Sequence, residues 1–142
     1  MVDSIDPAAR SAVMAKVRGK NTRPELVVRK MLFAAGYRYR LHVRKLPGSP
    51  DLVFTSRKKA IFVHGCFWHL HEGCRRARMP KSRCEFWSEK LLGNKYRDEK
   101  IMVDLANLGW DVLVVWECEL RNIPLLQVRM FEFLNQNNPV GK

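Results

Sequence analysis

The first clear pattern of apolar and polar positions is helical and lies between Thr22 and Gly36. The apolar residues at helical spacing are Leu26, Val27, Met31 and Ala34. Thr22 is a good N-cap, Glu25 completes a Thr-x-x-Glu capping box, and Gly36 suits the end of the helix. The Glu25 carboxylate therefore has two uses open to it: it reaches back to the Thr22 amide, or it faces a metal site. We expect it not to do both.

Residues 37–44 alternate between apolar and basic side chains, which is typical of a half-exposed strand. The apolar face would carry Tyr37, Tyr39, Leu41 and Val43. The basic face would carry Arg38, Arg40, His42 and Arg44.

Two further strands are predicted after the Pro-Gly turn at 47–50. Residues 51–54 and 60–64 are short apolar runs, and the charged turn between them is short enough to make a hairpin. Asp51 begins the first of these strands and His64 ends the second. The hairpin would hold both side chains at the same end of the sheet.

The second half of the chain predicts two helices and one strand. Helical patterns cover about 85–108 and 123–134, and the run WDVLVVW at 110–116 is apolar enough for a strand buried on both faces. The order is helix, three strands, helix, strand, helix, with the long helix as a crossover, and it predicts an α/β fold. We expect a flexible basic arm over 1–20, the folded domain over 21–135 and a loose tail over 136–142.

The charge of the chain indicates a partner. The 142 residues include 26 Lys and Arg against 14 Asp and Glu, a net charge of +12, and so basic a protein favours nucleic acid. No apolar run suits a membrane span, and the polar start does not resemble a signal peptide. Four cysteines, most of them close to histidines, suit a metal in a reducing compartment. We therefore expect a cytoplasmic domain that binds nucleic acid.

The stretch 61–74, IFVHGCFWHLHEGC, holds three of the four histidines and two of the four cysteines. A structural zinc site needs four thiolate or imidazole ligands. The candidates are three residues of this loop and one after the last strand: Cys66, His71, Cys74 and Cys118. His69 remains an alternative to His71, and Cys84 an alternative to any of the cysteines.

A second group of residues suits phosphodiester hydrolysis: Asp51, His64, His69 and Asp98. That reaction needs a cation to neutralise the charge that develops on the phosphate, and a base to take a proton from water. A carboxylate at a sheet end suits Mg²⁺, and a neutral imidazole suits the base. Alternatively, Asp51 only begins a strand and Asp98 is one of several solvated charges on a helix.

Four short motifs resemble those of one known family. They are Pro50-Asp51, His64-Gly65-Cys66-Phe67-Trp68-His69, Glu85-Phe86-Trp87 and Trp116-Glu117-Cys118. Together they resemble the very-short-patch repair endonucleases of bacteria over roughly residues 10–121, and HGCFWH is the most specific motif. The resemblance implies a restriction-endonuclease-like fold. It also implies an enzyme that nicks one DNA strand 5′ of the thymine in T:G mismatches left by deamination of 5-methylcytosine.

The resemblance also implies roles for single residues. Asp51 would bind the catalytic Mg²⁺ together with the backbone carbonyl of Val63, and His69 would be the general base. The hydrated magnesium site would be completed by His64, Glu25 and Asp98. A structural zinc would be held by Cys66, His71, Cys74 and Cys118. DNA would be contacted by an aromatic wedge of Phe67, Trp68 and Trp87, by Met14 of the N-terminal arm, and by Lys90 and Asn94 near the mismatched bases.

The chain departs from the family pattern without losing a catalytic group. Residues 69–74, HLHEGC, replace a run of histidines before the second zinc cysteine, Val63 stands where Thr is expected, and Cys84 is an additional thiol. Two other hypotheses remain open: a nuclease of the same fold that cuts an intact duplex, and a zinc-containing DNA-binding module without catalysis. We expect a monomer, because one nicked strand needs one active site. The resemblance further implies a protein near the bacterial nucleoid, in contact with mismatch-repair proteins.

Overall fold

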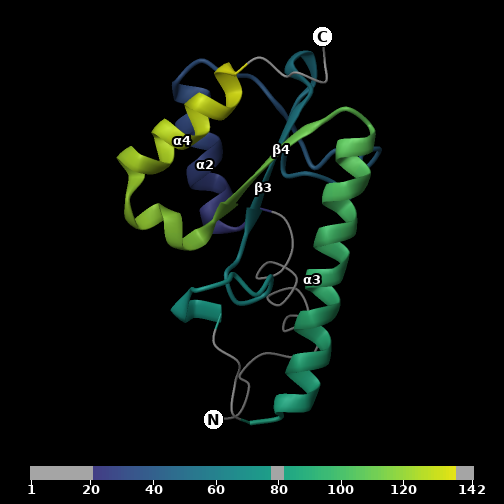
Figure 1. Ribbon diagram of the computed structural model, residues 1–142. Helices are drawn as coiled ribbons and strands as arrows, with labels where there is room; N and C mark the ends of the chain where they lie inside the picture. The colour runs from purple at the N-terminus through teal and green to yellow at the C-terminus, as the bar shows by residue number, and fades with distance from the viewer. Residues whose placement is uncertain (1–20, 78–81, 137–142) are drawn as a thin grey trace, which may run out of the picture.

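The structure, a computed structural model, describes residues 21–77 and 82–136 (Figure 1). Its helices and strands are α2 (Arg23–Ala34), β1 (Arg40–Leu41), β2 (Leu52–Phe54), β3 (Lys59–His64), α3 (Cys84–Asn107), β4 (Asp111–Trp116) and α4 (Ile123–Asn135). Three short 3-10 helices are η1 (Thr55–Arg57), η2 (Arg75–Ala77) and η3 (Glu117–Arg121). The predicted order of helix, three strands, helix, strand and helix is confirmed.

The strands form one mixed sheet in the order β1-β2-β3-β4. The pairs β1–β2 and β2–β3 are antiparallel, whereas β3 and β4 are parallel. Parallel neighbours need a crossover connection, and α3 supplies it as predicted. Figure 1 shows α2 and α4 side by side on one side of the sheet and the long helix α3 on the other. Within the described residues, no helix is both long and apolar enough to cross a bilayer.

The hydrophobic core lies between the sheet and the pair α2 and α4. Its buried side chains come from all three, namely Val28, Leu32, Leu52, Phe54, Ile61, Val115, Leu126, Met130 and Leu134. Full burial of one such large apolar side chain contributes about 1.5–3 kcal/mol relative to exposure. The core therefore fixes α2, and with it Glu25, against the strands that carry Asp51 and His64.

Two predictions about the strands are wrong in detail. The strand expected over residues 37–44 is reduced to β1, because His42 takes a left-handed backbone conformation with φ of 48° and ends the alternation. Leu41, expected on the apolar face, is exposed, although Tyr37 and Tyr39 pack against the core. β4 is not buried on both faces: only Val115 is fully buried. It is one of the two edge strands of the sheet, and among the described residues it has a neighbouring strand on one side only.

The turn before β2 is held against α3. Gly48 has φ of +74°, and a Cβ at this position would lie 2.7 Å from Ile101 Cγ2. Only glycine satisfies both conditions without a shift of the neighbouring chain. The close packing of Gly48 against Ile101 holds the segment before Asp51 against α3.

Candidate active site and metal centre

The hairpin of β2 and β3 places Asp51 at the end of the sheet where β3 finishes. Asp51 Oδ2 accepts a hydrogen bond of 2.7 Å from the backbone N–H of Val63, one residue before His64. Asp51 and His64 therefore lie at the same end of the sheet, as the hairpin predicted. Burial raises the pKa of Asp51 from 3.8 to about 6; the Val63 hydrogen bond opposes this rise, and the neighbouring charge of Glu25 adds to it.

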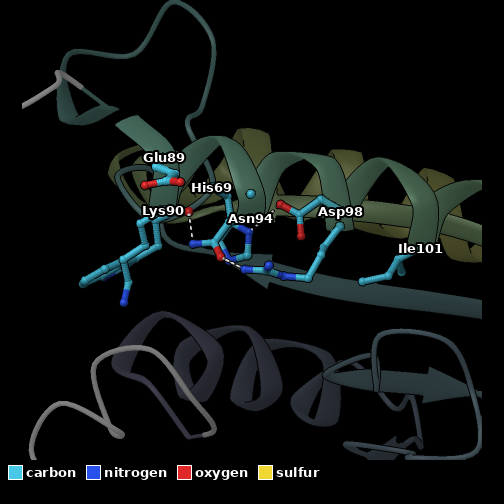
Figure 2. A pocket seen from close by; sticks show the side chains of 9 residues that line it. His69, Glu89, Lys90, Asn94, Asp98 and Ile101 are labelled. Atoms are coloured by element: carbon cyan, nitrogen blue, oxygen red, sulfur yellow. Dashed lines mark hydrogen bonds and ion pairs between the residues drawn. The ribbon is translucent and has the colours of Figure 1, made fainter. Parts of the chain in front are cut away.

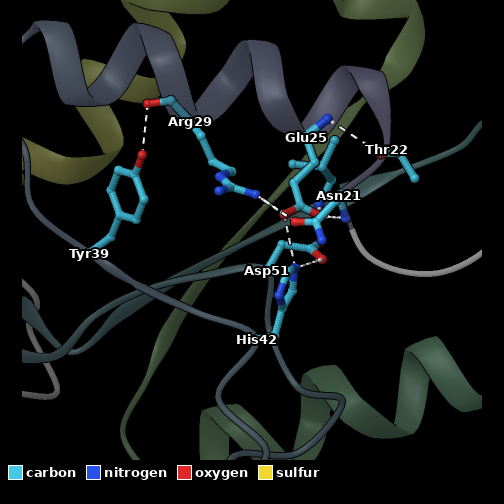
Figure 3. Close-up of polar contacts among 8 residues, drawn as sticks. Asn21, Thr22, Glu25, Arg29, Tyr39, His42 and Asp51 are labelled. Carbon is cyan, nitrogen blue, oxygen red and sulfur yellow. Dashed lines mark hydrogen bonds and ion pairs between the residues drawn. The ribbon is translucent and has the colours of Figure 1, made fainter. Parts of the chain in front are cut away.

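Glu25 faces Asp51 from the first turn of α2 and is almost completely buried. Its Oε1 accepts from the backbone N–H of Asn21 at 3.0 Å. Its Oε2 accepts from Arg29 Nη1 at 3.2 Å and from His42 Nε2 at 2.9 Å (Figure 3). The predicted bond from the Thr22 amide is not formed, because Glu25 Oε1 accepts from the backbone of Asn21 instead. The other oxygen faces His42, and a role of Glu25 at a metal remains a prediction.

His42 belongs to this group, although we assigned it only to the basic face of a strand. Its Nε2 lies 3.8 Å from Asp51 Oδ1 as well as 2.9 Å from Glu25 Oε2. One ligand atom from each of Glu25, His42 and Asp51 lies within 4.8 Å of the others, so the set could hold a metal ion. The signal in the sequence was a lone histidine among arginines, nine residues before Asp51.

A second group of ligand atoms lies beside the first and comprises His64, His69 and Asp98. The rings of His64 and His69 stack at 3.7 Å with 5° between their planes, and His69 Nδ1 lies 2.6 Å from Asp98 Oδ2. Burial and the neighbouring His69 lower the pKa of His64 to about 3, so this ring is neutral. Its buried Nδ1 has no hydrogen-bond partner among the described residues. Asp98 is thus paired with a ring and is not a solvated helix charge.

The two groups are close enough to act on one another. Asp51 is hydrogen-bonded to the backbone of Val63, and Val63 is the residue before His64, whose ring stacks on His69. The structure therefore brings together all five predicted catalytic residues, from α2, the sheet end, the loop after β3 and helix α3.

His69 also borders a hollow of about 540 Å³ along α3 (Figure 2). Lys90, Asn94, Asp98 and Trp68 are among its other lining residues. Asn94 is held in place because its Nδ2 donates to the Trp68 carbonyl at 3.0 Å. The two residues expected beside the mismatched bases, Lys90 and Asn94, thus lie next to the expected general base.

The three expected wedge aromatics contact one another. The ring centroids of Phe67 and Trp68 are 5.1 Å apart, those of Phe67 and Trp87 5.5 Å, and those of Trp68 and Trp87 5.9 Å. All three are half-buried, and none belongs to the hydrophobic core cluster of the described chain. Met14 lies outside the described residues, so its predicted role remains a prediction.

The four predicted zinc ligands form one cluster. A ligand atom from each of Cys66, His71, Cys74 and Cys118 lies within 4.8 Å of the others. His69 pairs with Asp98 instead, and Cys84 is exposed at the start of α3. The spacing-based choice of His71 over His69 is therefore the one that the geometry favours.

The donor set fits a dipositive soft or borderline cation. Burial raises the pKa of the Cys66 thiol to about 12, and burial raises that of Cys118 as well. Thiols packed this closely resist ionisation unless a cation neutralises the thiolates, and Zn²⁺ with three sulfurs and one imidazole is a common structural centre.

Trp116, at the end of β4, separates the two sites. Its ring stacks on His71 at 4.0 Å with 6° between the planes. It also meets His64 edge to face at 5.3 Å and His69 at 6.5 Å. One side chain therefore contacts both the cysteine-histidine cluster and the stacked pair of His64 and His69.

Comparison with known proteins agrees with this arrangement. A family model described as DNA mismatch endonuclease Vsr matches residues 2–76. The chain belongs to the Vsr family. It is 50% identical over 135 residues to the type II nicking enzyme V.XorIIP of Xanthomonas oryzae pv. oryzae, which covers 95% of this chain and 98% of that protein. Its identity to the DNA mismatch endonuclease Vsr of Escherichia coli K12 is 41% over 121 residues, or 85% of this chain and 77% of that protein. Like its family, the chain is a DNA endonuclease of the nicking type, with DNA as its substrate.

A third relative, the type II nicking enzyme V.NmeAIP of Neisseria meningitidis, is 43% identical over 130 residues and covers 92% of both chains. Membership of the Vsr family establishes the class of reaction. The roles of single residues still depend on the geometry described above.

Proposed function

We propose that the protein is a Mg²⁺-dependent endonuclease that nicks one strand of duplex DNA 5′ of the thymine in T:G mismatches arising from deamination of 5-methylcytosine. The observation that carries this proposal is the His69–Asp98 pair at 2.6 Å, next to Asp51 and opening onto the hollow lined by Trp68, Lys90 and Asn94. A nuclease site thus adjoins a surface with both aromatic and hydrogen-bonding side chains. The mismatch-specific name of the relative from Escherichia coli supports the same substrate.

The residues at the sheet end fit a magnesium ion. Asp51 and Glu25 offer hard oxygen donors. Burial raises the pKa of Asp51 to about 6, and a bound cation would favour its ionised form. Asp51 and the backbone carbonyl of Val63 would hold the ion, with Glu25, His64 and Asp98 around it. When bound, Mg²⁺ supplies positive charge that stabilises the phosphate in the transition state.

His69 is the proposed general base. Its Nδ1 is bound to Asp98 Oδ2, which fixes Nδ1–H and leaves Nε2 to accept a proton from the attacking water. The stacked ring of His64 restricts the rotation of His69. Asp98 and His64 are therefore positioning residues for the base.

The Cys66, His71, Cys74 and Cys118 cluster is the proposed structural zinc site. Three ligands belong to the loop after β3, and the fourth belongs to η3 after β4. The zinc would therefore join two segments that are far apart in the chain, in the manner of a disulfide but compatible with a reducing compartment.

Phe67, Trp68 and Trp87 are the proposed aromatic wedge, and Met14 on the N-terminal arm the proposed partner wedge. Insertion of a ring between base steps costs a few kcal/mol of lost stacking, and less where pairing is already poor. A T:G wobble is such a place, so the rings would convert weak pairing into selectivity. Lys90 and Asn94, next to Trp68 in the hollow, would contact the bases there.

The remaining parts of the proposal concern organisation. Residues 21–135 would form the endonuclease domain between a basic arm and a short tail. The enzyme would act as a monomer in the cytoplasm, together with mismatch-repair proteins.

A nicking assay on end-labelled duplexes tests the proposed substrate. Matched T:A and mismatched T:G duplexes of one sequence would be incubated with and without Mg²⁺. Magnesium should be omitted and not chelated, because a chelator would also remove zinc. We expect Mg²⁺-dependent nicking of the thymine strand of the T:G duplex alone. Equal nicking of both duplexes would indicate a nuclease for intact DNA, and no nicking would contradict the proposal.

A further inference from the structure

His42 is held in a backbone conformation that few side chains adopt. Its φ of 48° lies in the left-handed region, which is uncommon for residues other than glycine, although histidine is among those enriched there. The backbone N–H of His42 donates to the Asp51 carbonyl at 3.2 Å. β1 ends at Leu41, and this turn carries the imidazole from the basic face toward the end of the sheet (Figure 3).

The imidazole lies between the two carboxylates. Its Nε2 is 2.9 Å from Glu25 Oε2 and 3.8 Å from Asp51 Oδ1. An ionised carboxylate can only accept, so Nε2 carries the hydrogen of the shorter contact. The side chains of His42 and Glu25 are 12% and 2% exposed, so water competes little for this bond.

Within the described residues, no other hydrogen bond of the Glu25 side chain reaches the side of the site where Asp51 lies. Its remaining bonds are to Asn21 and Arg29, which flank it on the side of α2. His42 alone is bound to Glu25 through its side chain and to Asp51 through its backbone. It therefore contributes, together with the packing of α2 against the sheet, to the distance between the two carboxylates.

We propose that His42 is a positioning residue that holds Glu25 and Asp51 at the spacing required for the divalent cation. The inference rests on the proposed Mg²⁺-dependent function and adds a residue to it. Carboxylates that bind a metal are commonly oriented by such hydrogen-bonded partners, and loss of one typically costs 10- to 100-fold in metal affinity or activity.

Three variants separate this role from a structural one. His42→Gly removes the imidazole and adopts φ of 48° without strain, so a loss would not come from a strained backbone. His42→Gln restores an N–H donor of similar reach at greater backbone cost. Tyr39→Phe is the matched control, because it removes the bond from Tyr39 Oη to the Arg29 carbonyl at 2.9 Å and touches neither carboxylate.

The first readout is Mn²⁺ binding, measured from the EPR signal of free Mn²⁺ with zinc-loaded protein on a synthetic duplex that is already nicked. The second is the Mg²⁺ dependence of single-turnover nicking. We expect His42→Gly to weaken Mn²⁺ binding about 10- to 100-fold and to raise the Mg²⁺ requirement in parallel. His42→Gln should regain most of both, and Tyr39→Phe should match the wild type.

Wild-type affinity in His42→Gly would overturn the inference, and so would equal losses in the Gly and Gln variants, because the N–H donor would then be irrelevant. A loss in Tyr39→Phe as large as that in His42→Gly would also overturn it, because the effect would be one of general packing. A wild-type protein that neither nicks with Mg²⁺ nor binds Mn²⁺ would instead refute the proposed function itself.

Discussion

Asp51→Asn should stabilise the magnesium-free protein while it abolishes nicking. Burial raises the pKa of Asp51 from 3.8 to about 6, a shift of about two pKa units, and each unit corresponds to about 1.4 kcal/mol. The ionised carboxylate thus costs the folded state about 3 kcal/mol at neutral pH. Asparagine has nearly the same shape, carries no charge, and can still accept the hydrogen bond from Val63.

The pH dependence of this effect has a definite sign. The pKa of Asp51 is higher in the folded chain than in the unfolded chain, so ionisation favours unfolding. The penalty is absent below pH 3.8, grows as the pH rises toward 6, and is constant above. The variant should therefore exceed the wild type by about 3 kcal/mol in the free energy of unfolding at pH 7.5, and by about half of that at pH 5.

Urea unfolding of zinc-loaded protein, followed by circular dichroism in buffer without magnesium or chelator, measures both differences. Added Mg²⁺ should raise the unfolding midpoint of the wild type and leave that of Asp51→Asn unchanged. Asp104→Asn is the control, because Asp104 lies on the surface of α3 beside Lys100 and such pairs contribute at most about 1 kcal/mol. A variant no more stable than the wild type at pH 7.5, or a gain that does not shrink at pH 5, would refute the reasoning.

Three further predictions concern zinc, the base and the wedge. The Cys118→Ala variant should bind no zinc and give little folded protein, whereas Cys84→Ser should match the wild type in both. Elemental analysis measures the zinc content, and well-folded wild-type protein without zinc would exclude the site. His69→Ala should slow single-turnover nicking by a factor on the order of 10²–10⁴ with zinc retained, and an unchanged rate would mean that another group is the base. Trp68→Ala should reduce the preference for T:G over T:A duplexes, measured at fixed salt, with the fold and the salt-sensitive binding intact. Preserved discrimination would assign this ring a structural role.

The elements that depend on local signals were predictable. The cap at Thr22 and the helix that it begins, the hairpin of β2 and β3, and the crossover by α3 all follow from spacing and turn chemistry, and the structure shows each of them. The zinc-binding set was predictable because its ligand types are few and three of the four lie in one loop.

The features that depend on tertiary contacts were not predictable. The left-handed turn at His42 interrupts an alternation that looked regular, and nothing local requires it. The sequence placed His69 and Asp98 in one group but did not predict their direct contact, which joins residues 29 positions apart and depends on the packing of α3 against the sheet end. The actual partners of Glu25 were missed for the same reason, because each of its oxygens is bound by a different part of the chain.

The place of Trp116 would couple the proposed zinc centre to the proposed nuclease site. The indole stacks on His71, a proposed zinc ligand, on one side and meets His64 and His69 on the other. A larger ion in the cysteine cluster, such as Cd²⁺, would press on the His71 ring, and the indole would pass that displacement to the stacked imidazoles. The orientation of His69, the proposed base, would then depend on the radius of an ion that takes no part in the reaction.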